Sequence, residues 1–473
     1  MSLINQLVMR RYAILLIAIL LPLHIYAKRY VYPEYSLSQI QQIINESDHI
    51  IFTKGVYNVD DNTYLIVQSN KKLTFESGSR VDFINTRAKQ YESVFNIQGD
   101  NVVFEGLCFT SSSRCSRSVY GNGSRDGFSS LCTVIMIKGN NIVIKDCKFY
   151  NAEIAVSVSR GDHIELDNLY GECAQTVFAT RCNNLKISNL NSIITTTDVG
   201  KLDHHIYIKG DCKNIDVVDS HFVGGPSYAI QISGDYSDPS ISPKNVMIRN
   251  VELTETAMGL CVDLGYSDVS VYKMKATGVA ELGNSFFLTN RGGNVEILNS
   301  DISNFNYIES ETISIKGDKK GSTYFKKCDF QFLLPNTTAF MLYYLDRLLV
   351  EKCSFYYCST PIHDGFIVRT DPKKDFVPYI ELRDNKFYMD SINKSCFRVR
   401  TTSTTMNVLN NHFYNWTIQG GSLLSKDSIK KINFDANYAI YNFQDAKDNQ
   451  CRFKKIRKAK INKASKKYNI KKS

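Results

Sequence analysis

The stretch Asn141-Ile-Val-Ile-Lys-Asp-Cys-Lys-Phe149 carries the pattern that decides the fold of this 473-residue chain. An asparagine is followed by alternating apolar residues, a polar turn residue, a small residue and a closing aromatic. The same order returns at Asn214–Phe222 and at Asn294–Ile302. About thirteen copies start 21 to 40 residues apart, the remaining ones at Asn101, Asp162, Asn184, Asn245, Asp268, Ser322, Arg347, Tyr379, Thr405 and Lys431.

Each copy predicts short strands that cannot fold alone. Apolar residues at every second position give a strand with one buried face. A single copy holds too little apolar surface to be stable, so successive copies must stack on one another. No helical period separates the copies, so equivalent strands of successive turns must pair in parallel. We therefore predict an all-β, single-stranded parallel β-helix of about thirteen rungs over residues 48–440.

The repeats, together with the opening stretch Ile50-Ile-Phe-Thr-Lys-Gly-Val-Tyr57, resemble the right-handed parallel β-helix superfamily that includes pectate lyases, polygalacturonases and chondroitinase B-like lyases. The resemblance covers nearly all of residues 48–440. It implies a right-handed solenoid and a secreted protein that acts on carbohydrate. The sequence lacks the Asn-Thr-Asp and Gly-His-Gly motifs of polygalacturonases and the Trp-x-Asp-His strand of pectate lyases. The resemblance therefore assigns no subfamily.

The N-terminus predicts export. Arg10 and Arg11 precede an apolar run over Ala13–Leu23, and Ala27 offers a small residue for cleavage, as in a signal peptide over residues 1–27. The mature protein is then secreted, periplasmic or on the cell surface, and an uncleaved anchor is the alternative.

Residues 28–47 are predicted to cap the first rung, whose open end would otherwise expose core and strand edges. Leu37, Ile40 and Ile44 follow Ser36 at helical spacing, which predicts a short helix with Ser36 as N-cap.

The net charge of +10 comes from the two ends of the chain. Residues 451–473 hold 11 Lys or Arg and no acid; without them and the two arginines of residues 1–27, residues 28–450 carry −3. A nearly neutral body argues against a nucleic-acid partner. The basic tail is too polar to bury and is expected to be disordered. It either contacts an anionic glycan or the cell envelope or serves only solubility, and we expect the protein to be a monomer.

Most of the thirteen cysteines are expected to be structural. Three of them occupy one slot of the repeat, just before the closing aromatic, where other copies hold Ser or Asn: Cys147, Cys328 and Cys353, against Ser220, Ser300, Asn385 and Asn411. Such a column predicts packing between rungs. Only Cys115 with Cys132 and Cys353 with Cys358 merit a disulfide test. No Cys/His spacing predicts zinc, and no metal site is predicted.

One long interval lies between two copies. Residues Thr110–Leu131 are rich in Ser, Gly and Arg, which favours a loop that projects over one face of the solenoid.

In a repeat protein, residues that recur are scaffold, and residues that occur once are functional candidates. Five Gly-Asp pairs end strands and are therefore turns, at Asp100, Asp162, Asp211, Asp235 and Asp318. The pair His204-His205 occurs once. Since Ile206 and Ile208 must face the core, His205, Tyr207 and Lys209 are predicted to point outward in a row.

Neighbouring copies place mostly small residues beside this row, so it forms either a groove floor or an ordinary solvated surface. In the groove interpretation, the substrate-binding candidates are Arg160 and Arg181, which end the two preceding strands, and Gln231 and Asp263 on the following ones.

His, Tyr and Lys suit the proton transfers of β-elimination from a uronic-acid polysaccharide, and Arg binds carboxylates. His205 is then the base, Tyr207 the acid, and Lys209 with Arg181 neutralise the carboxylate; Lys209 as base is equally compatible. Lyases of the resembled superfamily use such residues, sometimes with calcium, which is the one cofactor left open. A glycoside hydrolase, for which Asp263 lacks a second carboxyl group, and a non-catalytic glycan-binding or surface protein are the alternatives.

Overall fold

A computed structural model describes this protein over residues 28–60, 64–84, 92–111, 132–195, 203–279 and 286–305, and over shorter stretches beyond: 311–315, 321–332, 338–342, 347–357, 366–369, 379–389, 397–400, 405–414, 431–435 and 438–439. The predicted signal peptide, residues 112–131 of the predicted insertion and the basic tail lie outside the described residues. Thr110 and Ser111, at the start of that insertion, belong to a strand. Within the described residues, no helix has the length and apolar character needed to cross a membrane.

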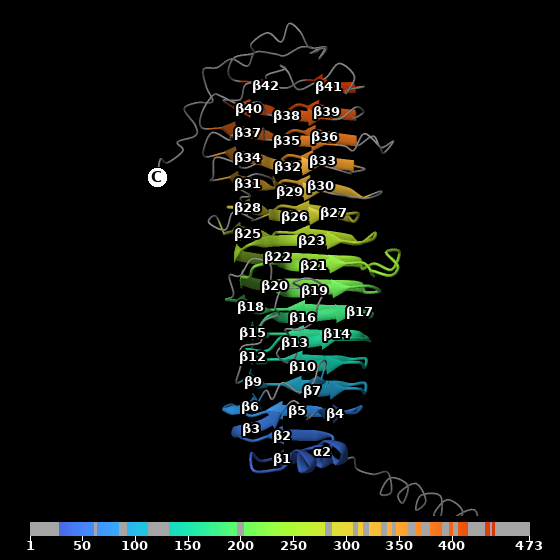
Figure 1. The fold of residues 1–473 in the computed structure, drawn as a ribbon, viewed down its shortest axis with the longest axis vertical. Coiled ribbons are helices and arrows are strands. Elements are labelled where there is room, and N and C mark those ends of the chain that lie inside the picture. Colours follow the sequence, from blue (N-terminus) through green and yellow to red (C-terminus); the bar gives the residue numbers. More distant parts are fainter. Residues whose placement is uncertain are drawn as a thin grey trace, which may run out of the picture.

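Parallel strands stack along one axis, so that each turn of the chain adds a rung to a column (Figure 1). Thirteen described strands form one side of the column, sheet B, which agrees with the number of repeats in the sequence. In axial order they are β4 (Leu65–Val67), β7 (Glu92–Ile97), β10 (Cys132–Ile137), β13 (Ile154–Val158), β16 (Gln175–Thr180), β19 (His204–Lys209), β21 (Tyr228–Ser233), β23 (Met258–Asp263), β26 (Phe286–Asn290), β29 (Glu311–Ile315), β32 (Thr338–Leu342), β35 (Phe366–Arg369) and β38 (Phe397–Arg400).

The other strands form sheet A, which has two faces joined by β20 (Lys213–Gly224) and β22 (Lys244–Thr256), two long strands that run through both. The first face contains β1 (Lys28–Val31), β2 (His49–Phe52), β5 (Lys72–Phe75), β8 (Val102–Glu105), β11 (Ile142–Lys145), β14 (Gly161–Asp167), β17 (Cys182–Ser188), β24 (Asp268–Tyr272), β27 (Asn294–Leu298), β30 (Ser322–Lys326), β33 (Arg347–Glu351), β36 (Tyr379–Arg383), β39 (Thr405–Leu409) and β41 (Lys431–Asp435).

The second face contains β3 (Gly55–Asp60), β6 (Ser79–Ile84), β9 (Cys108–Ser111), β12 (Lys148–Tyr150), β15 (Tyr170–Glu172), β18 (Asn191–Ile194), β25 (Lys275–Gly278), β28 (Asp301–Ser303), β31 (Asp329–Phe332), β34 (Ser354–Tyr357), β37 (Lys386–Met389), β40 (His412–Tyr414) and β42 (Tyr438–Ala439). The right-handed parallel β-helix predicted from the repeats is confirmed.

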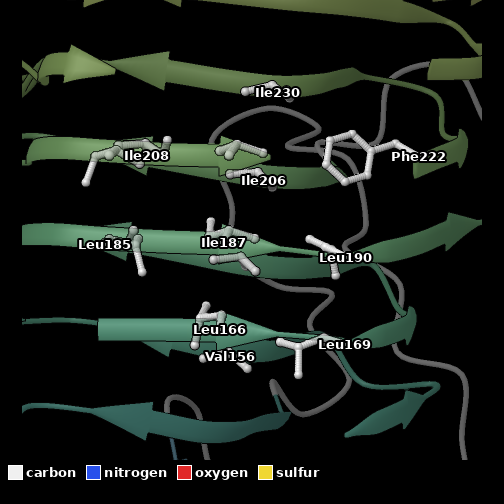
Figure 2. Packing of buried hydrophobic residues seen from close by; sticks show 14 of the residues in the cluster. Val156, Leu166, Leu169, Leu185, Ile187, Leu190, Ile206, Ile208, Phe222 and Ile230 are labelled. Carbon is white, nitrogen blue, oxygen red and sulfur yellow. The ribbon is translucent and has the colours of Figure 1, made fainter. Parts of the chain in front are cut away.

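The core consists of side chains stacked in rows between the sheets (Figure 2). Leu166, Ile187 and Val217 are aligned on successive strands, and all three are fully buried. Because successive rungs contribute an apolar residue at the same position, the core of the described residues continues from rung to rung.

The asparagine that begins each repeat fits a tight turn. Asn141 has a φ of 54°, a left-handed conformation that asparagine tolerates better than most residues. Its side-chain amide donates to Asn101 Oδ1 at 3.0 Å, and Asn101 donates to Asn70 Oδ1 at 2.9 Å. The repeated asparagine therefore serves both the backbone turn and a ladder of amides along the column.

The slot before the closing aromatic is a buried column, as predicted. The Cys353 backbone N–H donates to Asn385 Oδ1 at 2.9 Å, and the Asn385 N–H donates to Asn411 Oδ1 at 2.9 Å. Cys147, Cys328 and Cys353 are free thiols, which confirms their structural role; Cys115 and Cys358 lie outside the described residues. A close thiol pair that the sequence did not reveal is Cys182 with Cys212, whose sulfur atoms lie 3.6 Å apart on neighbouring rungs.

The predicted capping helix is present as α2 (Leu37–Glu46), at the end of the column beside β1 (Figure 1). Ser36 is its N-cap and forms a capping box with Gln39, while Ile40 and Ile44 are buried against the first rung. Gln41 also pairs with the edge strand β4: Ile66 N–H donates to Gln41 Oε1 at 2.7 Å, and Gln41 Nε2 donates to the Ile66 carbonyl at 3.0 Å.

Replacing Gln41 with Ala should destabilise the protein by about 1 to 3 kcal/mol, since two backbone groups of β4 lose their partners. Urea unfolding measures the change. Gln42→Ala is the matched control, because the exposed Gln42 amide bonds only to Glu46 on the same helix, at 2.8 Å. Equal losses in both variants would show that Gln41 contributes helix propensity rather than a cap on sheet B.

Candidate functional site on sheet B

Tyr207 lies on the outer face of sheet B, where the parallel register places one residue of each strand in a row along the axis. The row through Tyr207 on β19 includes Phe178 on β16 and Gln231 on β21. It continues to Cys261 on β23. The alignment of these strands expected from the sequence is therefore correct.

Lys209 belongs to a second row, two residues further along each strand. It is aligned with Thr180 on one side and Ser233 on the other, and Ser233 is aligned with Asp263. The two rows bring four of the predicted residues, Tyr207, Lys209, Gln231 and Asp263, onto one face.

His205 is not on that face, so its prediction as an outward residue is wrong. Its side chain is fully buried, and its ring stacks on the core residue Phe222 at 5.2 Å with an interplanar angle of 10°. Its two nitrogens lie 2.7 Å from Ser192 Oγ and 3.1 Å from the Gly224 carbonyl. Nε2 must donate to the carbonyl, so Nδ1 accepts from the hydroxyl and the imidazole is neutral.

The physical reason is a break in the inside–outside alternation where the chain enters sheet B. On β16, the consecutive residues Thr176 and Val177 are both fully buried, and Thr176 occupies the position of His205 on the neighbouring strand. The residues aligned with His205 on the following strands, such as Ala229 and Gly259, are small. They leave room inside the column for the imidazole ring and do not flank a groove on its surface.

Burial also removes His205 as a base. It lowers the pKa of the imidazole from 6.5 to about 3, because the charged form would lose its hydration. With both nitrogens already hydrogen-bonded and no exposed surface, the ring has no access to a substrate.

Two rings pack against Tyr207, the half-buried Phe178 and the buried His204. The Tyr207 ring lies 5.5 Å from Phe178 and 5.5 Å from His204, both in tilted arrangements. Burial raises the pKa of Tyr207, and the neighbouring Tyr236 raises it further, so the phenol stays protonated at neutral pH.

Tyr228 extends this cluster toward the C-terminus. It starts on β21, and its hydroxyl donates to Thr289 Oγ1 on β26, two strands further along sheet B, at 3.1 Å. The half-buried ring therefore lies across the intervening strand, and its centroid is 6.2 Å from that of Phe286. We call the surface formed by Phe178, Tyr207, Tyr228 and Phe286 the aromatic face; the buried His204 ring supports Tyr207 from below.

A loop over residues 234–243, between β21 and β22, stands beside one edge of the aromatic face (Figure 1). Two Asx turns hold it: Asp235 accepts from the Ser237 N–H at 2.8 Å, and Asp238 accepts from the Ser240 N–H at 3.0 Å. Its Tyr236 is 63% exposed, and the Lys209 ammonium lies 4.3 Å from the centre of the Tyr236 ring.

Asp263 is paired with a cation. Arg291 Nη1 lies 3.4 Å from both carboxylate oxygens, the Asp263 side chain is 11% exposed and the Arg291 side chain is 48% exposed. Asp263 therefore orients the guanidinium, which still offers donors to solvent or a ligand.

Arg160 and Arg181 are exposed at the turns that follow β13 and β16. Within the described residues, neither guanidinium forms an ion pair or contacts the Tyr207 and Lys209 rows. Their predicted role in binding a carboxylate stays a prediction. No three His, Cys, Asp or Glu side chains of the described residues are placed to hold one metal ion.

Sequence reasoning missed Tyr228, Tyr236 and Arg291. Tyr228 does carry a signal, because it follows His204 in register, so that two successive copies hold a ring residue at this position. Tyr236 and Arg291 lie in turns, where the repeat pattern gives no orientation.

No protein-family model and no curated protein matches this sequence. Among solved structures, the tailspike protein of E. coli bacteriophage HK620 in complex with a pentasaccharide is similar, with a TM-score of 0.55 and 10% identity over 85% of this chain and 75% of that chain. The surface protein and adhesin PfbA of Streptococcus pneumoniae has 15% identity over 84% of this chain and 95% of that chain, with a TM-score of 0.42. At such low identity the tailspike likeness concerns the fold alone.

Proposed function

We propose that this parallel β-helix is an exported protein that binds a polysaccharide along its aromatic face. The observation that carries the proposal is the placement of Tyr228, whose half-buried ring lies across β23 with its hydroxyl held by Thr289. Sugar rings pack their apolar faces on such fixed aromatic rings, and neighbouring polar groups bind their hydroxyls. The pentasaccharide bound to the similar tailspike protein supports a glycan as the class of ligand.

The charges around the aromatic face favour an anionic glycan. Lys209 stands at its edge, and Arg291 presents a half-exposed guanidinium held in place by Asp263. Arginine binds carboxylates through paired hydrogen bonds. Arg160 and Arg181 add two exposed cations at the turns of the neighbouring rungs. We therefore propose a uronic-acid-containing chain as the ligand.

Cleavage by β-elimination is the finer proposal. The Lys209 amine takes the proton from C5, the electron pair of the broken C–H bond forms the C4=C5 double bond, and the C4–O4 bond breaks. Tyr207, which stays protonated at neutral pH, gives its proton to O4. Lys209 and Tyr207 are two residues apart on β19, so both side chains leave the strand on the same side. His205 takes no part, because it is buried.

Tyr207→Ala should weaken binding of a uronic oligosaccharide about tenfold, because a stacking ring is lost. Isothermal titration calorimetry of the wild type and variant against a panel of uronic and neutral oligosaccharides measures the effect. Tyr272→Ala is the control, since Tyr272 is 39% exposed but lies on sheet A. Unchanged affinity in Tyr207→Ala would rule out the aromatic face as the binding site.

The same panel tests cleavage. Elimination releases products with a conjugated double bond, seen as new ultraviolet absorbance, whereas hydrolysis releases reducing ends without it. We expect Lys209→Ala and Tyr207→Phe to abolish the absorbance and to leave binding largely intact. Tight binding without either product would show that the protein binds the glycan but does not cleave it.

A further inference from the structure

A second surface of the molecule has the features of a sugar-binding site, and it lies on sheet A rather than on the aromatic face. A cleft of about 340 Å³ opens across β25, β28, β31 and β34, four successive strands of the second face. We call it the acidic cleft; the side chains that matter here are Lys275, Asp301, Ser303, Asp329, Gln331 and Tyr356.

The lining of the acidic cleft combines hydrogen-bonding groups with an aromatic wall. Asp301 and Asp329 are directly aligned on neighbouring strands, and two residues further on Ser303 is aligned with Gln331. Gln331 is in turn aligned with Tyr356, which is 37% exposed. Carboxylates, a hydroxyl and an amide beside an exposed ring are the groups that bind sugar hydroxyls and sugar faces.

The aromatic wall is rigid. Tyr356 stacks on Tyr388 of the next rung, with ring centroids 4.8 Å apart and an interplanar angle of 2°. The wall therefore continues along the axis, in the direction in which an extended chain would leave the cleft, and its ring positions are fixed before a ligand arrives.

The charge of the acidic cleft sets it apart from the aromatic face. The ammonium of Lys275 donates to Glu252 Oε1 at 2.7 Å, which neutralises that cation. Within the described part of the chain, neither Asp301 nor Asp329 has a cation at ion-pair distance. Glu252, Lys275, Asp301 and Asp329 follow one another in register, so three carboxylates share one cation and the cleft is net negative. A glycan that carries carboxylates is therefore repelled.

We propose that the acidic cleft binds an uncharged sugar chain, with Tyr356 stacking on one ring and Asp301 and Asp329 accepting from its hydroxyls. The protein then has two glycan sites of opposite preference on two sides of one solenoid. This site is independent of the proposed binding of uronic chains by the aromatic face.

The test uses the full chain with Tyr207→Ala and Lys209→Ala combined as background, so that the aromatic face has lost both a stacking ring and the cation at its edge. Calorimetry against neutral hexose and N-acetylhexosamine oligosaccharides and against uronic oligosaccharides should show binding of a neutral chain only. Adding Tyr356→Ala should weaken that binding about tenfold. Adding Asp301→Asn with Asp329→Asn instead should admit uronic chains, because the repulsion is gone while the shape is kept.

Three results would overturn the proposal: no neutral oligosaccharide binds, Tyr356→Ala binds as tightly as its parent, or uronic chains bind the cleft before the carboxylates are removed. Tyr272→Ala in the same background controls for the loss of an exposed tyrosine on sheet A. Circular dichroism of each variant verifies folding. Failure here leaves the aromatic-face proposal untouched, since that site is weakened equally in every variant that is compared.

Discussion

Acidification from pH 6.5 to pH 5 should cost this β-helix roughly 2 kcal/mol of folding free energy through His205 alone. The folded pKa of this buried imidazole is lowered to about 3 from 6.5. In that pH window the unfolded chain binds a proton that the folded chain does not, so stability is full above pH 6.5. It falls by about 1.4 kcal/mol per pH unit as the pH drops toward 3.

Urea unfolding between pH 7.5 and pH 5 measures this slope. His205→Gln removes the titrating group, so the variant should be less stable at pH 7.5 but show a shallower loss on acidification. His163→Gln is the control, because the His163 side chain is 66% exposed in a turn. The pKa of Glu351 is lowered to about 2, chiefly by its hydrogen bond with Tyr324, so that carboxylate acts only at lower pH. If the unfolding free energy of His205→Gln falls with pH as steeply as that of the wild type, His205 is not the group that causes the loss.

Phe355→Ala should destabilise the protein by about 3 to 5 kcal/mol, because it removes a fully buried ring and leaves a cavity. Phe355 stacks on Phe330 at 4.8 Å and on Phe387 at 4.9 Å, with interplanar angles of 2° and 7°. Both partners then lose a packed neighbour, and the core row breaks in the middle.

The adjacent residue provides the matched control. Tyr356 makes nearly the same stack, with Tyr388 at 4.8 Å and 2°, but on the outer surface. Tyr356→Ala should therefore cost clearly less than Phe355→Ala, since the Tyr356 side chain is already 37% exposed and its truncation leaves no enclosed cavity. Urea unfolding measures the free energy of unfolding of both variants. The comparison separates the effect of burying the ring from the effect of stacking it, because the stacking geometry is similar. Equal losses would mean that stacking, rather than burial, stabilises the rows.

The sequence predicted the scaffold better than the candidate site. The recurrence of Asn141 and its copies located the rungs, because the left-handed turn and the amide ladder depend on that residue and its copies alone. The cap at Ser36 was equally local, since a capping box lies within four residues. The register that places Tyr207 beside Gln231 followed from repetition, since stacked copies must align their apolar positions.

The orientation of His205 was beyond such reasoning. Strict alternation placed it outside, but the bend at the start of the sheet B strands from β7 to β26 turns two consecutive side chains inward. Whether the imidazole fits there depends on Phe222, Ser192 and Gly224, which come from other rungs and another sheet. A pattern with a period of two carries no information on such a bend.

The sequence by itself determined the fold class, the number of rungs, the turns and the cap, because a solenoid repeats one local solution and each copy encodes it again. The tertiary structure alone decided which surfaces have functional potential. The Tyr228 hydroxyl donates to Thr289, which lies 61 residues further along the chain. The acidic cleft forms from side chains on four strands. Those contacts occur once and join residues that no repeat relates, so only the stacking of the rungs in space brings them together.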